Sequence, residues 1–171
     1  GVVILSESQI SFDLPAGTGD SNSLSVSLDG QPASTGPINV AYVAPYVGSV
    51  TGSAPCQPDG NKIIECDVSA NLTLGLVGTD FGSDASLVSV FVGDAIEQSG
   101  PGRRLLQAEG TVECENVVIL TATTIECTVL DSAFPNGGFN LDVTVTVDGQ
   151  TGVLADAVSY GGPKMIPGTL D

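Results

Sequence analysis

The sequence contains no histidine, and it has only 4 lysines and arginines against 20 acidic residues, a formal net charge of −16. Without imidazole there is no Ser-His or Cys-His nucleophile pair and no histidine metal ligand, so we expect no enzyme activity. Nucleic acids and anionic membranes are poor partners, because their binding needs many cationic side chains. We interpret the acidity as a solvated surface that favours solubility.

The sequence also lacks any continuous apolar run of about 18 residues, so we expect no membrane insertion in this segment. No stretch has sustained helical spacing of its apolar residues. Instead, apolar residues alternate with polar ones, as in Leu24–Leu28 before Asp29-Gly30 and in Val143–Val147 before Asp148-Gly149. Such alternation predicts strands with one buried face, and Asp-Gly between strands predicts hairpin turns. The sequence therefore predicts an all-β sandwich or barrel.

Two parts of the chain carry the same motifs in the same order, with a spacing of 115 residues between Val2 and Val117. The motifs shared by residues 1–45 and 117–163 are Val-Val-Ile-Leu at Val2–Leu5 and Val117–Leu120, Asp-Gly-Gln at Asp29–Gln31 and Asp148–Gln150, and a closing tyrosine at Tyr42 and Tyr160. Residues 46–163 thus form one complete unit, and residues 1–45 match only its C-terminal half.

The half unit has two explanations, which the sequence leaves open. Either the chain is a window of a longer tandem array, or another chain supplies the missing strands. Half a sandwich would expose a sheet face and unpaired edges, so we expect residues 1–45 to pair with strands from outside residues 46–163. We expect each closing tyrosine to pack its ring in a core. Residues 164–171 are a tail, a linker or the first strand of a next unit.

The four cysteines fall in two close pairs. Cys56 and Cys66 flank a turn-rich stretch, and Cys114 and Cys127 flank a hairpin-like segment, so a bridge within each pair is natural. The other connectivities stay open, because four cysteines allow three. Zinc is the competing interpretation, against which the spacings and the lack of histidine argue. Disulfides imply an oxidising, extracellular or cell-surface setting. In the first unit Phe12 takes the position of Cys127.

Three further features are candidate sites. Asn71-Leu72-Thr73 is a sequon for an N-linked glycan, with an unused tripeptide as the alternative. Asp80 with Asp84, or Asp20 with Asp29, are candidate calcium ligands, although the spacing of an EF-hand is absent. The stretch from Glu97 to Gly110 interrupts the strand pattern with a basic, apolar tip. That tip is a candidate interaction loop for an acidic neighbour, a dibasic processing site or an ordinary insertion; its residues are Arg103, Arg104, Leu105 and Leu106.

Residues 72–82, which read Leu-Thr-Leu-Gly-Leu-Val-Gly-Thr-Asp-Phe-Gly, resemble the "ltvtGtnFg" signature of IPT/TIG immunoglobulin-like domains. Further matches follow in the order of the family at Val88–Gly93, Thr123–Thr128, Val143–Gln150 and Val158–Tyr160, although the proline that the family has after the cysteine is absent after Cys127. The segment Cys56–Cys66 resembles tandem arrays of large secreted or surface proteins, and Arg103–Gln107 resembles a tract common in green-algal extracellular proteins. The resemblance implies tandem immunoglobulin-like sandwiches, of which the first is only a C-terminal half.

The resemblance also implies a choice of functions, since the family occurs in cell-surface receptors, extracellular arrays and transcription factors. This acidic chain departs from the transcription-factor branch. We expect a structural repeat unit of an extracellular filament or surface coat, which assembles head to tail with copies of itself or neighbouring repeats. The alternative is a spacer or ligand-binding segment of a cell-surface receptor or adhesin ectodomain.

Overall fold

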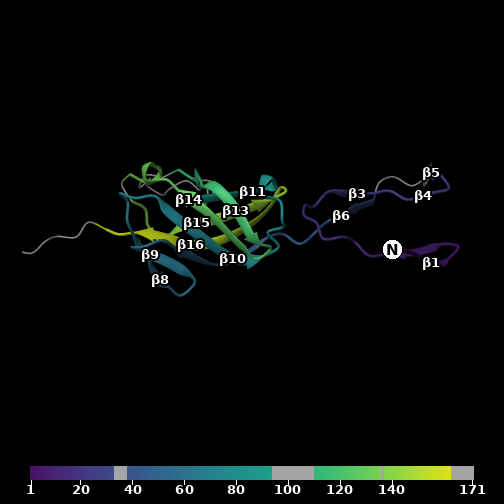
Figure 1. The fold of residues 1–171 in the computed structure, drawn as a ribbon, viewed down its shortest axis with the longest axis horizontal. Coiled ribbons are helices and arrows are strands. Elements are labelled where there is room, and N and C mark those ends of the chain that lie inside the picture. The colour runs from purple at the N-terminus through teal and green to yellow at the C-terminus, as the bar shows by residue number, and fades with distance from the viewer. Residues whose placement is uncertain (33–37, 94–109, 136, 163–171) are drawn as a thin grey trace, which may run out of the picture.

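The computed structural model describes residues 1–32, 38–93, 110–135 and 137–162. These residues are all-β apart from two three-residue 3-10 turns, η1 (Ala85–Leu87) and η2 (Asp131–Ala133). Within the described ranges, no helix is long and apolar enough to cross a membrane. Figure 1 shows two regions, which we call the arm (residues 1–45) and the body (residues 46–162). The predicted interaction loop at Arg103–Leu106 and the segment 164–171 lie outside the described residues.

The body consists of two sheets (Figure 1). A four-stranded sheet has the order β13-β14-β10-β7, and a six-stranded sheet has the order β12-β11-β15-β16-β9-β8. Neighbouring strands run antiparallel except β16 and β9, which are parallel. The strands are β7 (Tyr46–Gly52), β8 (Gln57–Asp59), β9 (Lys62–Cys66), β10 (Leu72–Thr79), β11 (Val88–Gly93), β12 (Val112–Glu113), β13 (Glu115–Thr121), β14 (Thr124–Val129), β15 (Leu141–Val147) and β16 (Gln150–Tyr160).

Both sheets contribute to one hydrophobic core, and the alternation in the sequence decides which side chains enter it. Along β10, Leu72, Leu74 and Leu76 are buried, whereas the residues between them are exposed or half-buried. The same alternation runs through all of β15. Tyr160 closes the core with its ring 5.6 Å from the ring of Phe134. Because successive side chains of a strand point to opposite faces, each strand has one core face and one outer face.

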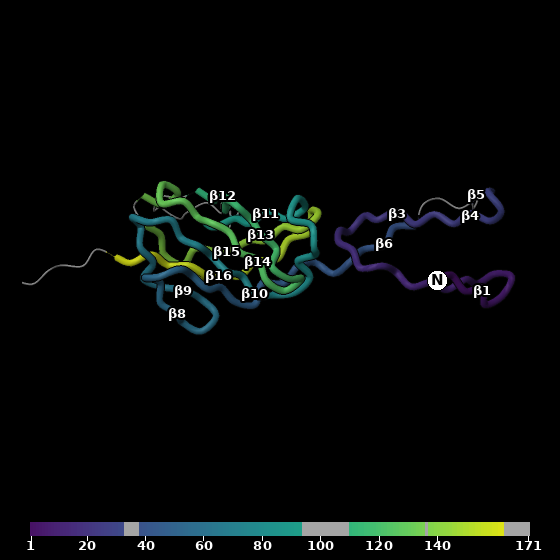
Figure 2. The backbone as a smooth tube through the Cα atoms, viewed as in Figure 1, coloured from purple at the N-terminus to yellow at the C-terminus, as the bar shows by residue number. Residues whose placement is uncertain are grey.

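The arm is built differently. Its six strands form three separate two-stranded sheets, β1-β2, β3-β6 and β4-β5, and none of its described residues joins a sheet of the body. Figure 2 shows the arm extending away from one end of the body. The strands are β1 (Val2–Ser6), β2 (Gln9–Phe12), β3 (Asn22–Leu24), β4 (Ser27–Leu28), β5 (Gln31–Pro32) and β6 (Ile38–Val40).

Two expectations for the arm are wrong. One is that Leu24–Leu28 forms a strand with one buried face, and the other is that Tyr42 packs its ring in a core. The alternating run Leu24–Leu28 is divided between β3 and β4, whereas its match in the body is the unbroken strand β15. β15 is hydrogen-bonded on both sides, by β11 and β16, whereas β3 and β4 each have a neighbour on one side only in the part of the chain that the structure describes. Tyr42 is half-buried outside the core cluster, and its hydroxyl donates a hydrogen bond to the carbonyl of Pro15 at 2.8 Å.

Candidate assembly surface on the arm

The β1-β2 hairpin of the arm has the same register as the β13-β14 hairpin of the body. Three arm pairs match three body pairs one for one at the spacing of the sequence repeat: Val3–Ser11 matches Val118–Glu126, Ile4–Ile10 matches Ile119–Ile125, and Ser6–Gln9 matches Thr121–Thr124. Both hairpins also have a register shift in the same place, between Ile4 and Ser6 and between Ile119 and Thr121. The repeat seen in the sequence is therefore a repeat of local structure.

The turns of the two hairpins match as well. In the arm, the Ser8 backbone N–H donates to Ser6 Oγ at 3.3 Å. In the body, the Thr123 backbone N–H donates to Thr121 Oγ1 at 3.2 Å. A hydroxyl that accepts a hydrogen bond from the backbone two residues later stabilises a tight turn locally. This interaction needs no tertiary contact, so both turns form from their own sequence.

A second hairpin turn is also duplicated. The central residues have positive φ angles in both copies, 50° and 79° at Asp29 and Gly30 and 47° and 82° at Asp148 and Gly149. Positive φ at both central positions is the type I′ turn that Asp-Gly favours. Leu28 pairs with Gln31 as Val147 pairs with Gln150. The arm therefore contains the same turn as β15-β16, but the strands that flank it, β4 and β5, have only 2 residues each.

The tyrosine that closes each copy makes a matching backbone hydrogen bond. The Tyr42 N–H donates to the carbonyl of Gly19 at 2.9 Å, and the Tyr160 N–H donates to that of Gly138 at 2.8 Å. Asn22 also pairs with Val40 as Leu141 pairs with Val158; these four residues are matched by the repeat. The arm thus reproduces the hydrogen-bonded framework of the second half of the body.

What differs between the two copies is burial. Ile10 is 42% exposed and Leu28 is 78% exposed, whereas their matches in the body, Ile125 and Val147, are buried. Other large apolar side chains of the arm are exposed too; they are Val2, Val3, Ile4, Leu5, Leu14, Val26, Ile38 and Val43. Exposed large apolar side chains concentrated in one part of the chain indicate a candidate contact with another protein segment.

The arm is joined to the body by a small number of polar contacts. Thr18 Oγ1 donates to Asp148 Oδ2 at 3.3 Å, and Gln150 Nε2 donates to the carbonyl of Tyr42 at 2.9 Å. A Cβ at Gly82, where φ is +73°, would lie 2.9 Å from Thr18 Cγ2, so glycine allows the close approach. The Asp148–Gln150 turn of the body, one copy of the duplicated turn, therefore makes both of these hydrogen bonds to the arm.

A groove of about 510 Å³ lies at this joint, between Ala16–Thr18 of the arm and the segment Thr79–Asp84 of the body. Two of the candidate calcium ligands, Asp80 and Asp84, line it. The carboxylate of Asp84 accepts the Ser86 hydroxyl at 2.7 Å and the Ser86 N–H at 3.0 Å, and these bonds lower the pKa of Asp84. Asp84 therefore serves as a local cap for η1.

The other calcium candidates, Asp20 and Asp29, do not line this groove. Asp20 accepts a hydrogen bond from the Ser21 hydroxyl, and Asp29 lies in the type I′ turn. Among the described residues, no group of three or more acidic or cysteine side chains is arranged to hold a metal ion.

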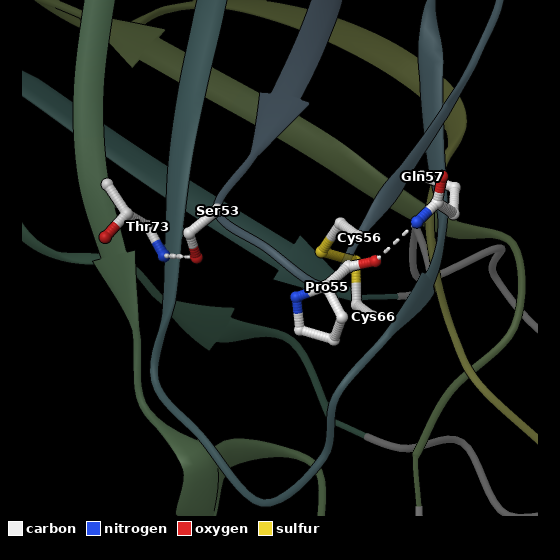
Figure 3. Close-up of a disulfide and its surroundings, with 6 residues drawn as sticks. All are labelled: Ser53, Pro55, Cys56, Gln57, Cys66 and Thr73. Atoms are coloured by element: carbon white, nitrogen blue, oxygen red, sulfur yellow. Dashed lines mark hydrogen bonds between the residues drawn. A yellow bond between two sulfur atoms is a disulfide. The ribbon is translucent and has the colours of Figure 1, made fainter.

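Both cysteine pairs form disulfides, Cys56–Cys66 and Cys114–Cys127. Figure 3 shows the first bridge beside the start of β10, where the Thr73 backbone N–H donates to Ser53 Oγ at 3.1 Å. The second bridge lies in the core, where Cys114 and Cys127 are both buried. The two disulfides indicate an oxidising environment.

The sequon residue Asn71 is exposed at the start of β10. Its Oδ1 accepts a hydrogen bond from the Asp131 backbone N–H at 2.9 Å. This bond uses the amide oxygen, so it leaves the amide nitrogen, to which a glycan would be joined, directed away from the Asp131 N–H. The fold is therefore compatible with the predicted glycan at this position.

Comparisons with known proteins give no family. No protein-family model, no curated protein and no solved structure matches the chain. The described residues establish an all-β protein with several, mostly antiparallel sheets and two disulfides.

Sequence reasoning missed the joint between arm and body. Thr18 and Gln150 carry no recognisable motif, and their partners lie 130 and 108 residues away in the chain. One signal was present, since Gln150 belongs to the duplicated Asp-Gly-Gln turn. In the arm the matching residue is Gln31, which is exposed.

The open strand edge and the exposed apolar side chains of the arm favour binding of a further strand. Among the described residues, β2 is paired only with β1, so its other edge is open to pairing with a further strand. Apolar side chains lie on the same hairpin. A strand that adds here would gain both ladder hydrogen bonds and apolar contact.

Proposed function

We propose that the chain is a structural repeat unit of an extracellular filament or surface coat, and that its units assemble head to tail through IPT/TIG-like immunoglobulin domains. In this proposal residues 46–163, which contain the body, are a complete domain, and the arm, residues 1–45, is the C-terminal half of another. The partners are copies of the chain or neighbouring repeats.

One observation carries the proposal. The arm has the register, the turns and the closing hydrogen bonds of the second half of the body, yet its apolar side chains are exposed. A framework of this kind is stable only when an opposite sheet covers it, because isolated two-stranded hairpins are marginal in water. Assembly with a neighbouring unit would supply that cover.

Other features support a structural role outside the cell. The two disulfides fit an oxidising compartment, and the net charge of −16 keeps unassembled chains apart in solution. The chain has no histidine, and all 4 of its cysteines are bridged, so it offers no thiol or imidazole for catalysis. We therefore propose a non-catalytic unit without nucleic-acid partners.

The proposed domain family rests on the order of motifs and on the arrangement of the body. The matched signature, residues 72–82, contains β10 and the buried Phe81, and both belong to the core that the two sheets share. Two facing sheets with a cystine across the core are typical of immunoglobulin-like sandwiches.

Electron microscopy of native material that contains this chain tests the proposal. We expect continuous filaments with a regular repeat and with density over the arm. Chains with I4D and I10D should not assemble, because these variants place carboxylates on the side of the hairpin whose body counterparts, Ile119 and Ile125, are half-buried and buried. Chains with V3D and L5D are the matched control, because the corresponding body residues, Val118 and Leu120, are about half exposed.

The alternative function is a spacer or ligand-binding segment of a receptor or adhesin ectodomain. The course of the chain favours it, since the arm meets the body at one end and the last described residues leave at the opposite end (Figure 1). Such a course suits domains strung in a row. Isolated, flexible rows of domains in the micrographs would replace the filament proposal with this one.

A further inference from the structure

The arm lacks specific neighbours that its counterpart in the body has. In the body, β14 is hydrogen-bonded to β13 on one side and to β10 on the other, whereas β2 is bonded, within the described ranges, to β1 alone. In the body, β15 lies between β11 and β16, whereas β3 and β4 have no second neighbour among the described residues. The absent neighbours therefore correspond to β10 and β11, which belong to the first half of the unit.

The pairing of β10 with β14 and of β11 with β15 in the body predicts which arm residues such neighbours would face. Along β10, Leu74 is opposite Cys127 and Leu76 is opposite Ile125. By the repeat, a strand of this type would place one leucine opposite Phe12 and the next opposite Ile10. Leu72 is opposite Val129, whose match in the arm is the exposed Leu14. The three arm side chains follow the alternation that three leucines at every second position require.

The pairing of β11 with β15 in the six-stranded sheet gives a corresponding match in the arm. Along β11, Val90 is opposite Val145, and Val92 is opposite Val143. Their matches in the arm are Val26, which is 37% exposed, and Leu24, which is half-buried. A valine-rich strand would thus pair along the run that contains β3 and β4. It would also cover Leu28, which is 78% exposed.

We infer that the arm binds the first-half strands of a neighbouring unit of the same kind, a segment patterned like residues 46–93, in the register that these residues use within the body. This inference rests on the proposed function and names the partner of its assembly surface. The occupant offers two uncharged strands with alternating leucine or valine, as β10 and β11 do.

Charge favours this occupant over a second arm. The described residues of the arm include acidic side chains and no basic ones; the acidic residues are Glu7, Asp13, Asp20 and Asp29. Two arms placed face to face would repel each other, and both would lack the same strands. A first-half segment instead supplies uncharged strands of the type that is missing.

A test extends the full chain at Gly1 with a second copy of residues 46–115. This places the copy's Cys114 13 residues before Phe12, the separation that Cys114 and Cys127 have in the body. In the extended chain with F12C, we expect the copy's Cys114 to be bridged to the introduced cysteine in nearly all molecules. Peptide mapping by mass spectrometry without reduction measures this bridge.

The matched control is S11C in the same extended chain. Ser11 corresponds to Glu126, which is exposed and lies between the two buried residues Ile125 and Cys127. We expect S11C and the copy's Cys114 to remain free thiols. Equal bridging of F12C and S11C, or bridging of neither, would overturn the inferred register.

A second measurement needs no introduced cysteine. In the extended chain with the copy's Cys114 changed to alanine, amide exchange along β2 should slow by about a hundredfold relative to the unextended chain. The native Cys114–Cys127 bridge of the body reports that the chain has folded. A folded body together with unchanged exchange along β2 would overturn the inference.

The two proposals fail separately. If F12C is bridged but native material contains no filaments, the inferred occupant stands and the filament proposal falls. If filaments form but F12C and S11C behave alike, the filament proposal stands and the inferred occupant falls.

Discussion

The arm and the body contain the same hairpin in two environments. Ile4–Ile10 and Ile119–Ile125 are paired in the same register, yet Ile10 is 42% exposed and Ile125 is buried. Backbone pairing and turn type therefore follow from local sequence, since they are identical in both places. Burial does not, because it needs the strands β10 and β7 that continue the sheet of the body.

The comparison also shows what a second neighbour does for a strand. β15 stays regular over seven residues between β11 and β16, whereas the matching run in the arm is divided into β3 and β4. The sequences of both runs alternate in the same way. Ladder bonds on both edges are thus needed to keep this run as a continuous strand.

The largest expected difference between the two regions comes from trimming the matched isoleucines. I125A should lower the free energy of unfolding by about 2–5 kcal/mol, because it leaves a cavity in the core. I10A should change it by less than about 1 kcal/mol, because Ile10 is 42% exposed and lies outside the core cluster. Urea denaturation measures the change in the free energy of unfolding for both variants. Equal changes would show that the arm has a core of its own.

The second effect concerns the buried disulfide. Replacing Cys114 and Cys127 together with alanine should cost about 2–4 kcal/mol of unfolding free energy, since the bridge restricts the unfolded chain. The control is F12A, the matching position in the arm, with an expected change below about 1 kcal/mol, because Phe12 is half-buried and lies outside the core cluster. A destabilisation by F12A as large as that of the double variant would contradict the view that the arm is uncovered. Thermal unfolding monitored by circular dichroism gives both values.

A third prediction concerns pH. Burial raises the pKa of Tyr160 to about 12 from the ordinary value of 10.0. Between these values the folded state keeps the proton and the unfolded state releases it, so stability should be unaffected by Tyr160 below pH 10 and should fall as the pH rises towards 12. Y160F should remove this part of the decline. An unchanged alkaline unfolding curve for Y160F would show that the Tyr160 hydroxyl is not desolvated.

The smallest expected effect is at the joint. Q150A removes the hydrogen bond to the Tyr42 carbonyl, which is worth about 0.5–1.5 kcal/mol. Amide exchange in the arm near Tyr42 should become faster, while the melting temperature of the body stays nearly the same. Q31A is the matched control, because Gln31 is exposed and makes no such contact within the described residues. Equal changes in both variants would argue against a specific joint.

Several features were predictable from the sequence because they are local. The Asp-Gly turns appear at Asp29 and Asp148, the alternation of β10 and β15 gives their buried faces, and each disulfide joins cysteines close in sequence. Each of these features depends on residues that are near one another in the chain. The all-β class follows from the same patterns.

Other features could not be read from local patterns. The joint brings Thr18 to Asp148, and the parallel pairing brings β9 beside β16, across long stretches of chain. Tyr42 and Tyr160 close matching motifs, yet only Tyr160 lies in the core. The difference comes from Phe134 and the neighbouring strands, which the motif itself does not contain.

The sequence by itself determined the turns, the register of the β1-β2 and β13-β14 hairpins and the duplication, because pairing in a hairpin is fixed by a turn of a few residues. Only the tertiary structure decided which copy has a core. Burial of an apolar face depends on a second sheet arriving from elsewhere in the chain, and in the described residues that sheet covers the body and not the arm.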